Sequence, residues 1–584
     1  MTFAVFVAPW GAAETRYLLA MSGTLEESRR APAGGQAIAA ERFVGQESAG
    51  WGRRRGLFVA LIALVAFVAL SAFLYLVSTH AFLPDSDGAT VVLEGNAIIH
   101  GDVALHGWSL SYDSFWLLDA LYYAVALAIV GIHGYLLHLI PAIIAALVVV
   151  AGALIARDGQ RGLVGLVGAG VVIAVLALPT HLLAYFFLRG PLHVDTVLCA
   201  LIAFIALKDH RFDWRRWVVA VVFLAAGALG DLQVLALGTI PLFLGGAAAA
   251  LRARRVLVAL ASTTAAVASV VIALIVREIT KTFGAFALIK PNPRAPYSMM
   301  FGANLKLAGH YFANLVGVGS SAYGNGGAPT SFVYAHAVVL VLIGASLVLG
   351  IVSLVKALIV GDTGSVESLP RSTMDDFLVL GALGGLVVFL ALTTEPIFAY
   401  GRYLVPSLIF GVILMARYAT RLAAYFARSR DAIPRVIPLV LATAAVAVAA
   451  SLASATGFEL AQTKPFDPYA KLATFLERHH LHEGLGDYWT SSIVTVESDN
   501  GVVVRPITAK PNGTLVRYDR ESDASWYAGH HFQFLALNPT LNFGNVNVLT
   551  ATSTFGKPIH VWIAYGLEIL VWRHPITVSS QGIT

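Results

Sequence analysis

Long apolar runs separated by short polar stretches dominate the hydrophobic pattern from Leu57 to Ala455. A helix needs about 20 mostly apolar residues to cross the roughly 30 Å hydrocarbon core of a bilayer. The pattern therefore predicts a polytopic α-helical membrane protein with about eleven spans. These spans centre on Leu57–Ser78, Leu137–Ala156, Leu163–His181, Asp195–Leu207, Trp217–Leu229, Leu232–Leu251, Val256–Val276, Val333–Val355, Phe377–Leu392, Tyr403–Tyr418 and Ile437–Ala455.

The basic runs between these segments predict the orientation, because cytoplasmic loops are enriched in Lys and Arg. The runs alternate correctly only if the short apolar stretch Leu121–Ile132 does not cross the membrane, so an interfacial helix is predicted there. The N-terminus is then cytoplasmic, and everything after Ala455 is extracytoplasmic. The basic runs are Arg53–Arg55, Lys208–Arg216, Leu251–Arg255 and Arg421–Arg435.

The pattern changes in the last part of the chain, residues 457–584, where charge rises and short β-branched or aromatic runs alternate with Gly, Pro and Asn. A small extracytoplasmic α+β domain is predicted, with an amphipathic helix in DPYAKLATFLERHHL. The expected strands are SSIVTVES, GVVVRPITA, GTLVRYDR, FQFLAL and IHVWIAYGLEILVWR. The sequence Asn512–Thr514 matches a glycosylation sequon, but a tight Asn-Gly turn between strands is the favoured interpretation.

Composition supports a membrane protein, since 58% of residues are hydrophobic, 12% are charged and the mean hydropathy is +0.75. The net charge of +5 and the single cysteine, Cys199, add little. Met1–Gly50 is predicted to be a disordered cytoplasmic tail, in which Met21 is an alternative start. The membrane domain is expected to cover 51–456. The sequence contains no phosphate-binding Walker loop, HExxH or CxxC motif, which gives nucleotide-driven transport and zinc proteolysis no support.

The two long outer loops, 80–136 and 278–330, differ in charge. Residues 80–119 carry six acids and neither Lys nor Arg, and this part is called the acidic loop below. The second loop is basic, with Lys281, Lys290, Arg294 and Lys306. An acidic and a basic loop on one face suit a site that handles a phosphate with the help of carboxylates.

Two acids, Asp85 and Asp87, follow the first span almost at once. Neighbouring like charges raise a pKa or require a cation, so the pair is predicted to act as a general base or to bind Mg²⁺ or Mn²⁺. Asp87 has an alternative role as the N-cap of a helix that starts near Ala89.

Further polar residues lie at the predicted outer ends of spans, where they are costly and therefore candidates for function. His181 has an interface-anchoring role as its alternative, and Arg189 and Arg402 could extend toward headgroups rather than bind a phosphate. The candidates for substrate binding are Glu94, Asp113, Trp116, His181, Arg189, His193, Asp195, Glu395, Tyr400 and Arg402, beside Asp119, Asp231, Gln233 and Tyr403.

The acids after the first span, the segment YYAVALAIVGIHGYLLHLIPAIIAAL, the late RYLVP and the extracytoplasmic tail together resemble integral-membrane GT-C glycosyltransferases. The branch most similar in pattern contains the protein O-mannosyltransferases and aminoarabinose transferases. The chain also resembles a set of actinobacterial membrane proteins with DSDGA, GNAIIHGD, DYWTSS and WYAGHHF blocks. It departs from the branch at His138, where an Arg is common, and at LDALYY, where His-Pro-Pro usually precedes the tyrosines.

The resemblance implies an inverting transfer of a sugar from a polyprenyl-phosphate donor to a glycan, lipid or protein acceptor of the cell envelope, at the plasma membrane and without nucleic acid. It implies that Asp85 or Asp87 is the general base. Arg402, with Arg189 or Arg294, is expected to neutralise the phosphate. Trp108, Trp116, Tyr122 and Tyr123 are expected to offer stacking surfaces, and the tail to recognise the acceptor.

Two alternatives stay open. A lipid or polysaccharide transporter, or a non-catalytic envelope-assembly protein, would show an internal repeat with helices broken at mid-membrane. A ligase-like transferase acting on a diphosphate-linked glycan would need a basic pair, for which Lys281, Lys290 and Arg294 are available.

Overall fold

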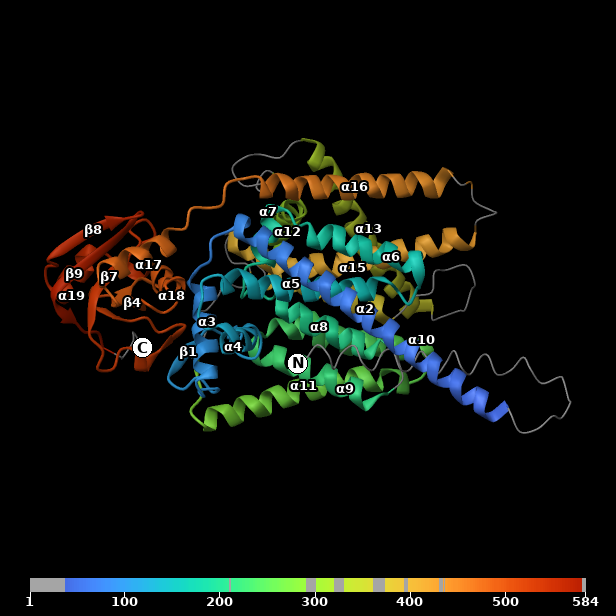
Figure 1. Cartoon of the computed structure of the whole chain (residues 1–584), viewed down its shortest axis with the longest axis horizontal. Coiled ribbons are helices and arrows are strands. Elements are labelled where there is room, and N and C mark those ends of the chain that lie inside the picture. The colour runs from blue at the N-terminus through green and yellow to red at the C-terminus, as the bar shows by residue number, and fades with distance from the viewer. Residues whose placement is uncertain are drawn as a thin grey trace. The chain divides into compact units, whose positions relative to one another are not determined.

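The computed structural model describes residues 37–208, 212–289, 301–319, 330–360, 373–392, 398–429, 434 and 436–579 (Figure 1). The chain divides into two units, Met1–Ala72 and Phe73–Thr584, and the contacts below lie within the second. Most of the predicted tail Met1–Gly50, with Met21, lies outside the described residues. The helices up to residue 460 are α2 (Ala37–Ala81), α3 (Ser86–Ile99), α4 (Asp119–Val130), α5 (Leu136–Ala156), α6 (Gly162–Val172), η1 (Ile173–Ala177), α7 (His181–Phe187), α8 (Val194–Leu207), α9 (Trp214–Gly230), η2 (Leu235–Thr239), α10 (Ile240–Ala253), α11 (Leu257–Thr282), α12 (Phe301–Val316), α13 (Thr330–Val360), α14 (Thr373–Leu392), η5 (Phe398–Leu404), α15 (Val405–Arg428) and α16 (Val436–Leu460).

Eight helices of the described chain are long and apolar enough to cross a membrane, which confirms a multi-pass helical membrane protein. A ninth span is possible if Gly162–Ala177 and His181–Phe187, which meet at a bend of 92°, count together. The two remaining predicted spans are shorter helices: α8 has 14 residues and α9 has 17. At 1.5 Å per residue, α8 is about 21 Å long and falls short of the bilayer core.

The predicted interfacial helix exists as α4, whose 12 residues are too few to cross the membrane. One side of the helix, including Ala120, Tyr123 and Leu127, is buried, whereas Leu121, Val125 and Ile129 are exposed. The helix packs along α3, and a Cβ at Gly95 would meet the α4 backbone nitrogen of Ala124 at 2.9 Å. Glycine therefore allows the two short helices to approach closely.

Helix α15 is the centre of the membrane part, with 83% of its most apolar stretch buried against α5, α6, α13 and α14. Close approach depends on small residues, as is usual between membrane helices. A Cβ at Gly168 of α6 would meet the α15 carbonyl oxygen of Ala416 at 2.8 Å. By contrast, only 6% of the apolar stretch of α16 is buried, which suits contact with lipid.

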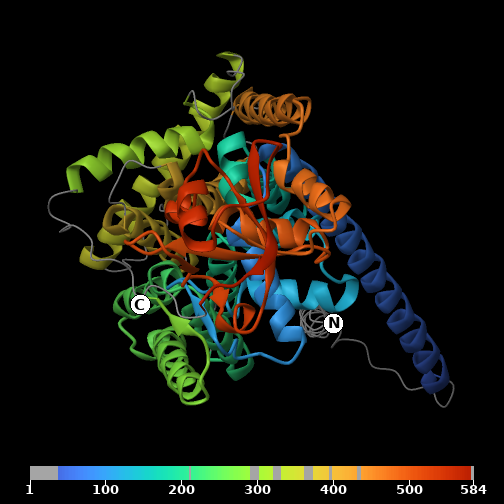
Figure 2. The ribbon, with the colours of Figure 1, turned by 90° about the vertical axis from the view of Figure 1, so that its left-hand side faces the viewer.

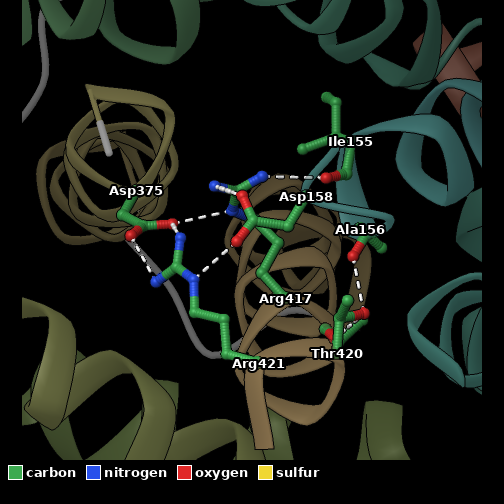
Figure 3. Close-up of polar contacts among 8 residues, drawn as sticks. Ile155, Ala156, Asp158, Asp375, Arg417, Thr420 and Arg421 are labelled. Carbon is green, nitrogen blue, oxygen red and sulfur yellow. Dashed lines mark hydrogen bonds and ion pairs between the residues drawn. The ribbon is translucent and has the colours of Figure 1, made fainter. Parts of the chain in front are cut away.

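A buried ion cluster joins three helical segments around α15 (Figure 3). Asp375, in the first turn of α14, accepts hydrogen bonds from Arg417 and Arg421 of α15, each at 2.7 Å. Asp158, which follows α5, pairs with the same two guanidinium groups at 2.5 and 2.7 Å. Two acids thus meet two arginines, so the charges balance where water is largely excluded.

The C-terminal part contains a six-stranded mixed sheet of order β5-β4-β3-β7-β9-β8. This confirms the predicted strand-containing region, and Figure 2 looks onto its strands (red). The sheet closes over a core that includes Leu485, Leu535 and Leu570. Its elements are α17 (Pro468–Arg478), β3 (Glu483–Gly486), α18 (Tyr488–Glu497), β4 (Val503–Ala509), β5 (Leu515–Arg517), β7 (Phe532–Leu537), α19 (Val548–Phe555), β8 (His560–Ala564) and β9 (Leu567–Ile576).

One predicted strand is wrong: SSIVTVES forms most of helix α18. Strands β3 and β4 are parallel neighbours, and a parallel pair needs a crossover, which α18 supplies. The helix buries hydroxyl residues such as Ser491, Ser492 and Thr495, whose hydroxyls are hydrogen-bonded. Tertiary packing therefore overrides the β-branched pattern. The Asn512–Thr514 segment forms the turn between β4 and β5, with Gly513 at φ +83°.

A second, three-stranded sheet joins distant parts of the chain in the order β2-β1-β6. Strand β1 (Trp108–Leu110) belongs to the acidic loop, β2 (Ala287–Leu288) to the second loop, and β6 (Ser522–Asp523) to the C-terminal part. The C-terminal part is thus hydrogen-bonded to the acidic loop in addition to its covalent connection after α16.

Replacement of Asp375 by alanine is expected to destabilise the protein by about 3–5 kcal/mol, because it leaves two buried guanidinium groups with one carboxylate. The free energy of unfolding in detergent, measured by denaturant titration, checks this. Lys281→Ala is the control, since its partner Glu278 is 68% exposed and the pair lies on the surface. Equal stability of the two variants would contradict a structural role for the cluster.

Candidate functional site

The N-terminus of α3 places Asp85 and Asp87 side by side in the sequence but in different roles. Asp85 is the N-cap, with extended backbone angles, and its Oδ1 accepts the N–H of Gly88 at 3.2 Å. Asp87 lies in the first turn, where a negative charge also suits the helix dipole. The alternative prediction that Asp87 caps a helix near Ala89 is therefore wrong, because the helix begins at Ser86.

Arg189 reaches the other oxygen of Asp85 and forms an ion pair with it. The guanidinium also contacts the hydroxyl of Tyr185 and lies 4.7 Å from the centre of that ring. The turn that carries Arg189 follows α7, which the 92° bend directs away from α6. It approaches α3 closely, since a Cβ at Gly88 would lie 3.1 Å from the carbonyl oxygen of Gly190.

Asp87 is contacted by the C-terminal part of the chain. The hydroxyl of Tyr488, the first residue of α18, donates to Asp87 Oδ1 at 2.5 Å and also contacts Glu521. Burial raises the pKa of Asp87, although the Tyr488 hydrogen bond and the positive charge of Arg402 oppose the increase. Burial, followed by the charge of Asp87, raises the pKa of Glu521 to about 7.

Arg402 is the second cation of the site and comes from η5, just before α15. It donates to the hydroxyl of Tyr403 at 3.2 Å and is attracted by the charges of Asp87 and Asp113. Its Nε is buried and has no hydrogen-bond partner within the described ranges. An unpartnered buried donor on a guanidinium suits an anion such as a phosphate.

A second polar cluster adjoins Arg402 through Tyr403, whose ring lies 5.5 Å from that of His193. His193 Nδ1 lies 2.8 Å from Asp231 Oδ2, which also accepts the hydroxyl of Thr196 at 2.5 Å. Asp113, His193 and Asp231 each offer a ligand atom within 4.8 Å of the others. The sequence predicted Asp85 and Asp87 as the ligands of a cation. These two acids are instead contacted by Arg189 and Tyr488, so Asp113, His193 and Asp231 form a different candidate site.

Three further acids, Glu94, Asp119 and Asp195, are buried near these clusters. Asp119 is hydrogen-bonded to Asp195, and its charge interacts with that of Glu94. Each of the three has one oxygen without a hydrogen-bond partner in the described part of the chain. Asp119 also lines a small cavity together with Arg189. Burial, followed by the charge of Glu521, raises the pKa of Glu94 well above its usual range.

Other candidate residues lie apart from the acids of α3. His181 pairs with Glu459 at 3.3 Å, and Tyr400 stacks on Tyr403 at 6.0 Å. Glu395, Lys290 and Arg294 lie outside the described residues.

The aromatic surface predicted for the acidic loop is not open. Trp116 is buried, donates its indole N–H to Val103 at 2.8 Å and packs against Phe286. Trp108 is buried against Trp526, and Tyr123 is fully buried. The C-terminal part covers Trp108 and the second loop covers Trp116, whereas Tyr123 of α4 packs against α3 at Gly95.

Sequence reasoning did not identify Tyr488 and Glu521. Tyr488 lies in the DYWTSS block, just before the predicted strand SSIVTVES, and no role was predicted for it. Glu521 lies 434 residues after Asp87 in the chain, and no local pattern indicates their proximity. Only the fold of the C-terminal part brings these residues together.

No protein-family model matches the chain, and a search of curated proteins also gives no match. The fold is similar to that of several solved membrane proteins. ArnT from Cupriavidus metallidurans, solved with undecaprenyl phosphate, is 12% identical and has a TM-score of 0.47 over 87% of this chain and 97% of ArnT.

The oligosaccharyltransferase of Archaeoglobus fulgidus, solved with zinc and sulfate, is 12% identical, with a TM-score of 0.41 over 83% of this chain and 70% of that protein. The same enzyme tethered to an acceptor peptide is 13% identical, with a TM-score of 0.39 over 75% and 63%. ArnT and the oligosaccharyltransferase are both GT-C glycosyltransferases. Both proteins are at most 13% identical to this chain, with TM-scores below 0.5.

Proposed function

We propose that the protein transfers a sugar from a polyprenyl-phosphate donor to a hydroxyl of a cell-envelope acceptor. The observation that carries this proposal is the placement of two acids beside two arginines, Asp85 with Arg189 and Asp87 with Arg402, where a membrane helix ends. A carboxylate can accept the proton of a hydroxyl, and the guanidinium groups can hold a phosphate. The basic runs between spans place this site on the outer face.

Asp87 is the better general base of the two acids. Both oxygens of Asp85 are used, one by the helix N-terminus and one by the ion pair with Arg189. Burial raises the pKa of both acids, which brings their basicity closer to that useful at neutral pH, so the choice rests on their contacts: Asp87 accepts a hydrogen bond from the neutral hydroxyl of Tyr488 instead of forming an ion pair like that of Asp85. Of the two acids that the sequence offered as general base, we therefore choose Asp87.

The reaction then follows from these positions. Asp87 takes the proton of the acceptor hydroxyl as its oxygen attacks the anomeric carbon. The bond from that carbon to the phosphate oxygen breaks, and both electrons of that bond leave with the polyprenyl phosphate. Attack from the side opposite the leaving group inverts the configuration. Arg402 and Arg189 stabilise the negative charge that develops on the phosphate.

Transport is the alternative that a broken span would favour. The bend between Ala177 and His181 is such a break. However, the bend brings Arg189 to Asp85, with which it forms an ion pair. The bend is therefore explained as part of a site at the end of the helices. The polar residues of the site also come from loops and helix termini.

The group Asp113, His193 and Asp231 is the better candidate for a divalent cation. Two carboxylates and an imidazole suit Mn²⁺, and Gln233, beside His193, has a buried Oε1 without a hydrogen-bond partner among the described residues. A cation held there would supply positive charge beside the sugar phosphate.

Purified protein is therefore expected to bind Mn²⁺, and Asp231→Asn is expected to weaken binding at least about tenfold by removing one charged ligand. Electron paramagnetic resonance of free Mn²⁺ measures this. Glu459→Gln, at the separate His181 pair, serves as the control and should bind normally. Equal binding by both variants would contradict the assignment.

Asp87→Asn is expected to lower the transfer rate about 10²–10⁴-fold, because the amide cannot accept the proton. Transfer of radiolabelled sugar from a panel of polyprenyl-phosphate sugars measures this. Asp85→Asn should have a smaller effect through Arg189. Asp102→Asn, an acid of the same loop whose partner His106 is 58% exposed, should transfer at the wild-type rate. Full activity of Asp87→Asn would exclude Asp87 as the base.

The transfer rate is expected to fall as the pH falls, because Asp87 must be ionised to accept a proton. Its pKa is raised, so the midpoint of this decrease should lie above the ordinary aspartate value of about 3.9. The pH dependence of kcat/KM reports this midpoint. A rate that remains constant down to the ordinary aspartate range would be inconsistent with a buried base.

A further inference from the structure

The C-terminal part of the chain is held against the acidic loop by several independent contacts. Strand β6 pairs with β1, and the N–H of Glu521 donates to the carbonyl of Ser109 at 2.5 Å. Arg517 donates to Ser109 Oγ at 3.2 Å. Deeper in the interface, the buried hydroxyl of Thr90 on α3 donates to that of Ser492 on α18 at 3.0 Å.

These contacts place Tyr488 at Asp87 with little freedom. The Tyr488 ring packs against Trp489, Tyr518 and Phe543, with ring centres 5.0, 5.1 and 5.8 Å away. A phenol has one proton to donate, so its contacts with two carboxyl groups require that one of these groups be protonated. Glu521, with a pKa of about 7, can carry that proton and donate to Tyr488, which then donates to Asp87.

We propose that Tyr488 is a positioning residue that holds Asp87 for catalysis, so that the C-terminal part completes the site. The inference rests on the proposed role of Asp87 as base. The positive charge of Arg402 also attracts Asp87. Without the Tyr488 hydrogen bond, Asp87 would turn toward the guanidinium, where an ion pair would lower its basicity and occupy the phosphate-binding group.

Tyr488→Phe tests this, since it removes the hydroxyl and keeps the packed ring. The expected result is a decrease of about 10²-fold in kcat with the acceptor KM within about threefold, as for a misplaced catalytic group. Tyr518→Phe is the matched control. It removes a hydroxyl from the neighbouring ring, which interacts with Glu521 and Asp87 through charge and for which the described residues show no hydrogen bond to either acid. Equal kcat values for the two variants would overturn the proposal.

A double variant shows whether Tyr488 acts through Asp87. In an Asp87→Asn background, Tyr488→Phe should change the residual rate less than about threefold, because the group it positions is already inactive. A full additional decrease of about 10²-fold would show that Tyr488 acts independently of Asp87 and would overturn the proposal.

A disulfide between Thr90→Cys and Ser492→Cys separates this inference from the proposed function. The two hydroxyls are 3.0 Å apart, so the cysteines should cross-link under oxidation, while Cys199 is buried in α8. The cross-linked protein should retain wild-type transfer. Loss of transfer that reduction restores, or absence of the cross-link, would overturn the inference. A cross-link in a protein that transfers no sugar from any donor would instead reject the proposed function.

Discussion

The burial of two carboxylates at one helix N-terminus is the constraint on which the rest of the site depends. Asp85 and Asp87 are separated by one residue, and water cannot fully solvate either of them. Each buried charge must therefore meet a cation or a hydrogen-bond donor. Asp85 meets Arg189 and the N–H of Gly88, whereas Asp87 meets Tyr488 and the field of Arg402. The residues that meet this requirement, Arg189, Arg402 and Tyr488, come from three distant parts of the chain.

The two arginines of the site lie in or beside irregular segments of the fold. Arg189 follows the bent segment after α6, and Arg402 lies in the 3₁₀ segment that precedes α15. Helix α15 is held further along by the ion cluster of Arg417 and Arg421 with Asp375. The ion cluster fixes the position of α15 near Arg417 and Arg421. The segment before the N-terminus of α15 can therefore be irregular, because the position of the helix does not depend on it.

The sequence predicted which residues form the site better than it predicted which of them contact one another. Asp85, Arg189 and Arg402 could be selected because charged residues beside apolar spans are costly. Their partners could not be predicted, since pairing depends on the bend after α6 and on the approach of Gly88 to Gly190. The strands of the C-terminal part were predicted from alternating runs, but the helix at Tyr488 was not. Its β-branched residues favour a strand, and only the parallel pairing of β3 with β4 requires a helix there.

The different partners of the two acids explain how one helix N-terminus can supply two functions. The N-cap position uses an oxygen of Asp85 for the helix itself, and Arg189 uses the other, so this acid is best suited to hold a cation in place. Two residues later, Asp87 is in the first turn and its contact comes from a neutral phenol. A phenol orients a carboxylate without neutralising it, so Asp87 can still accept a proton. Under the proposed function, this helix N-terminus would separate phosphate binding from base catalysis, and the C-terminal part would set which acid remains basic.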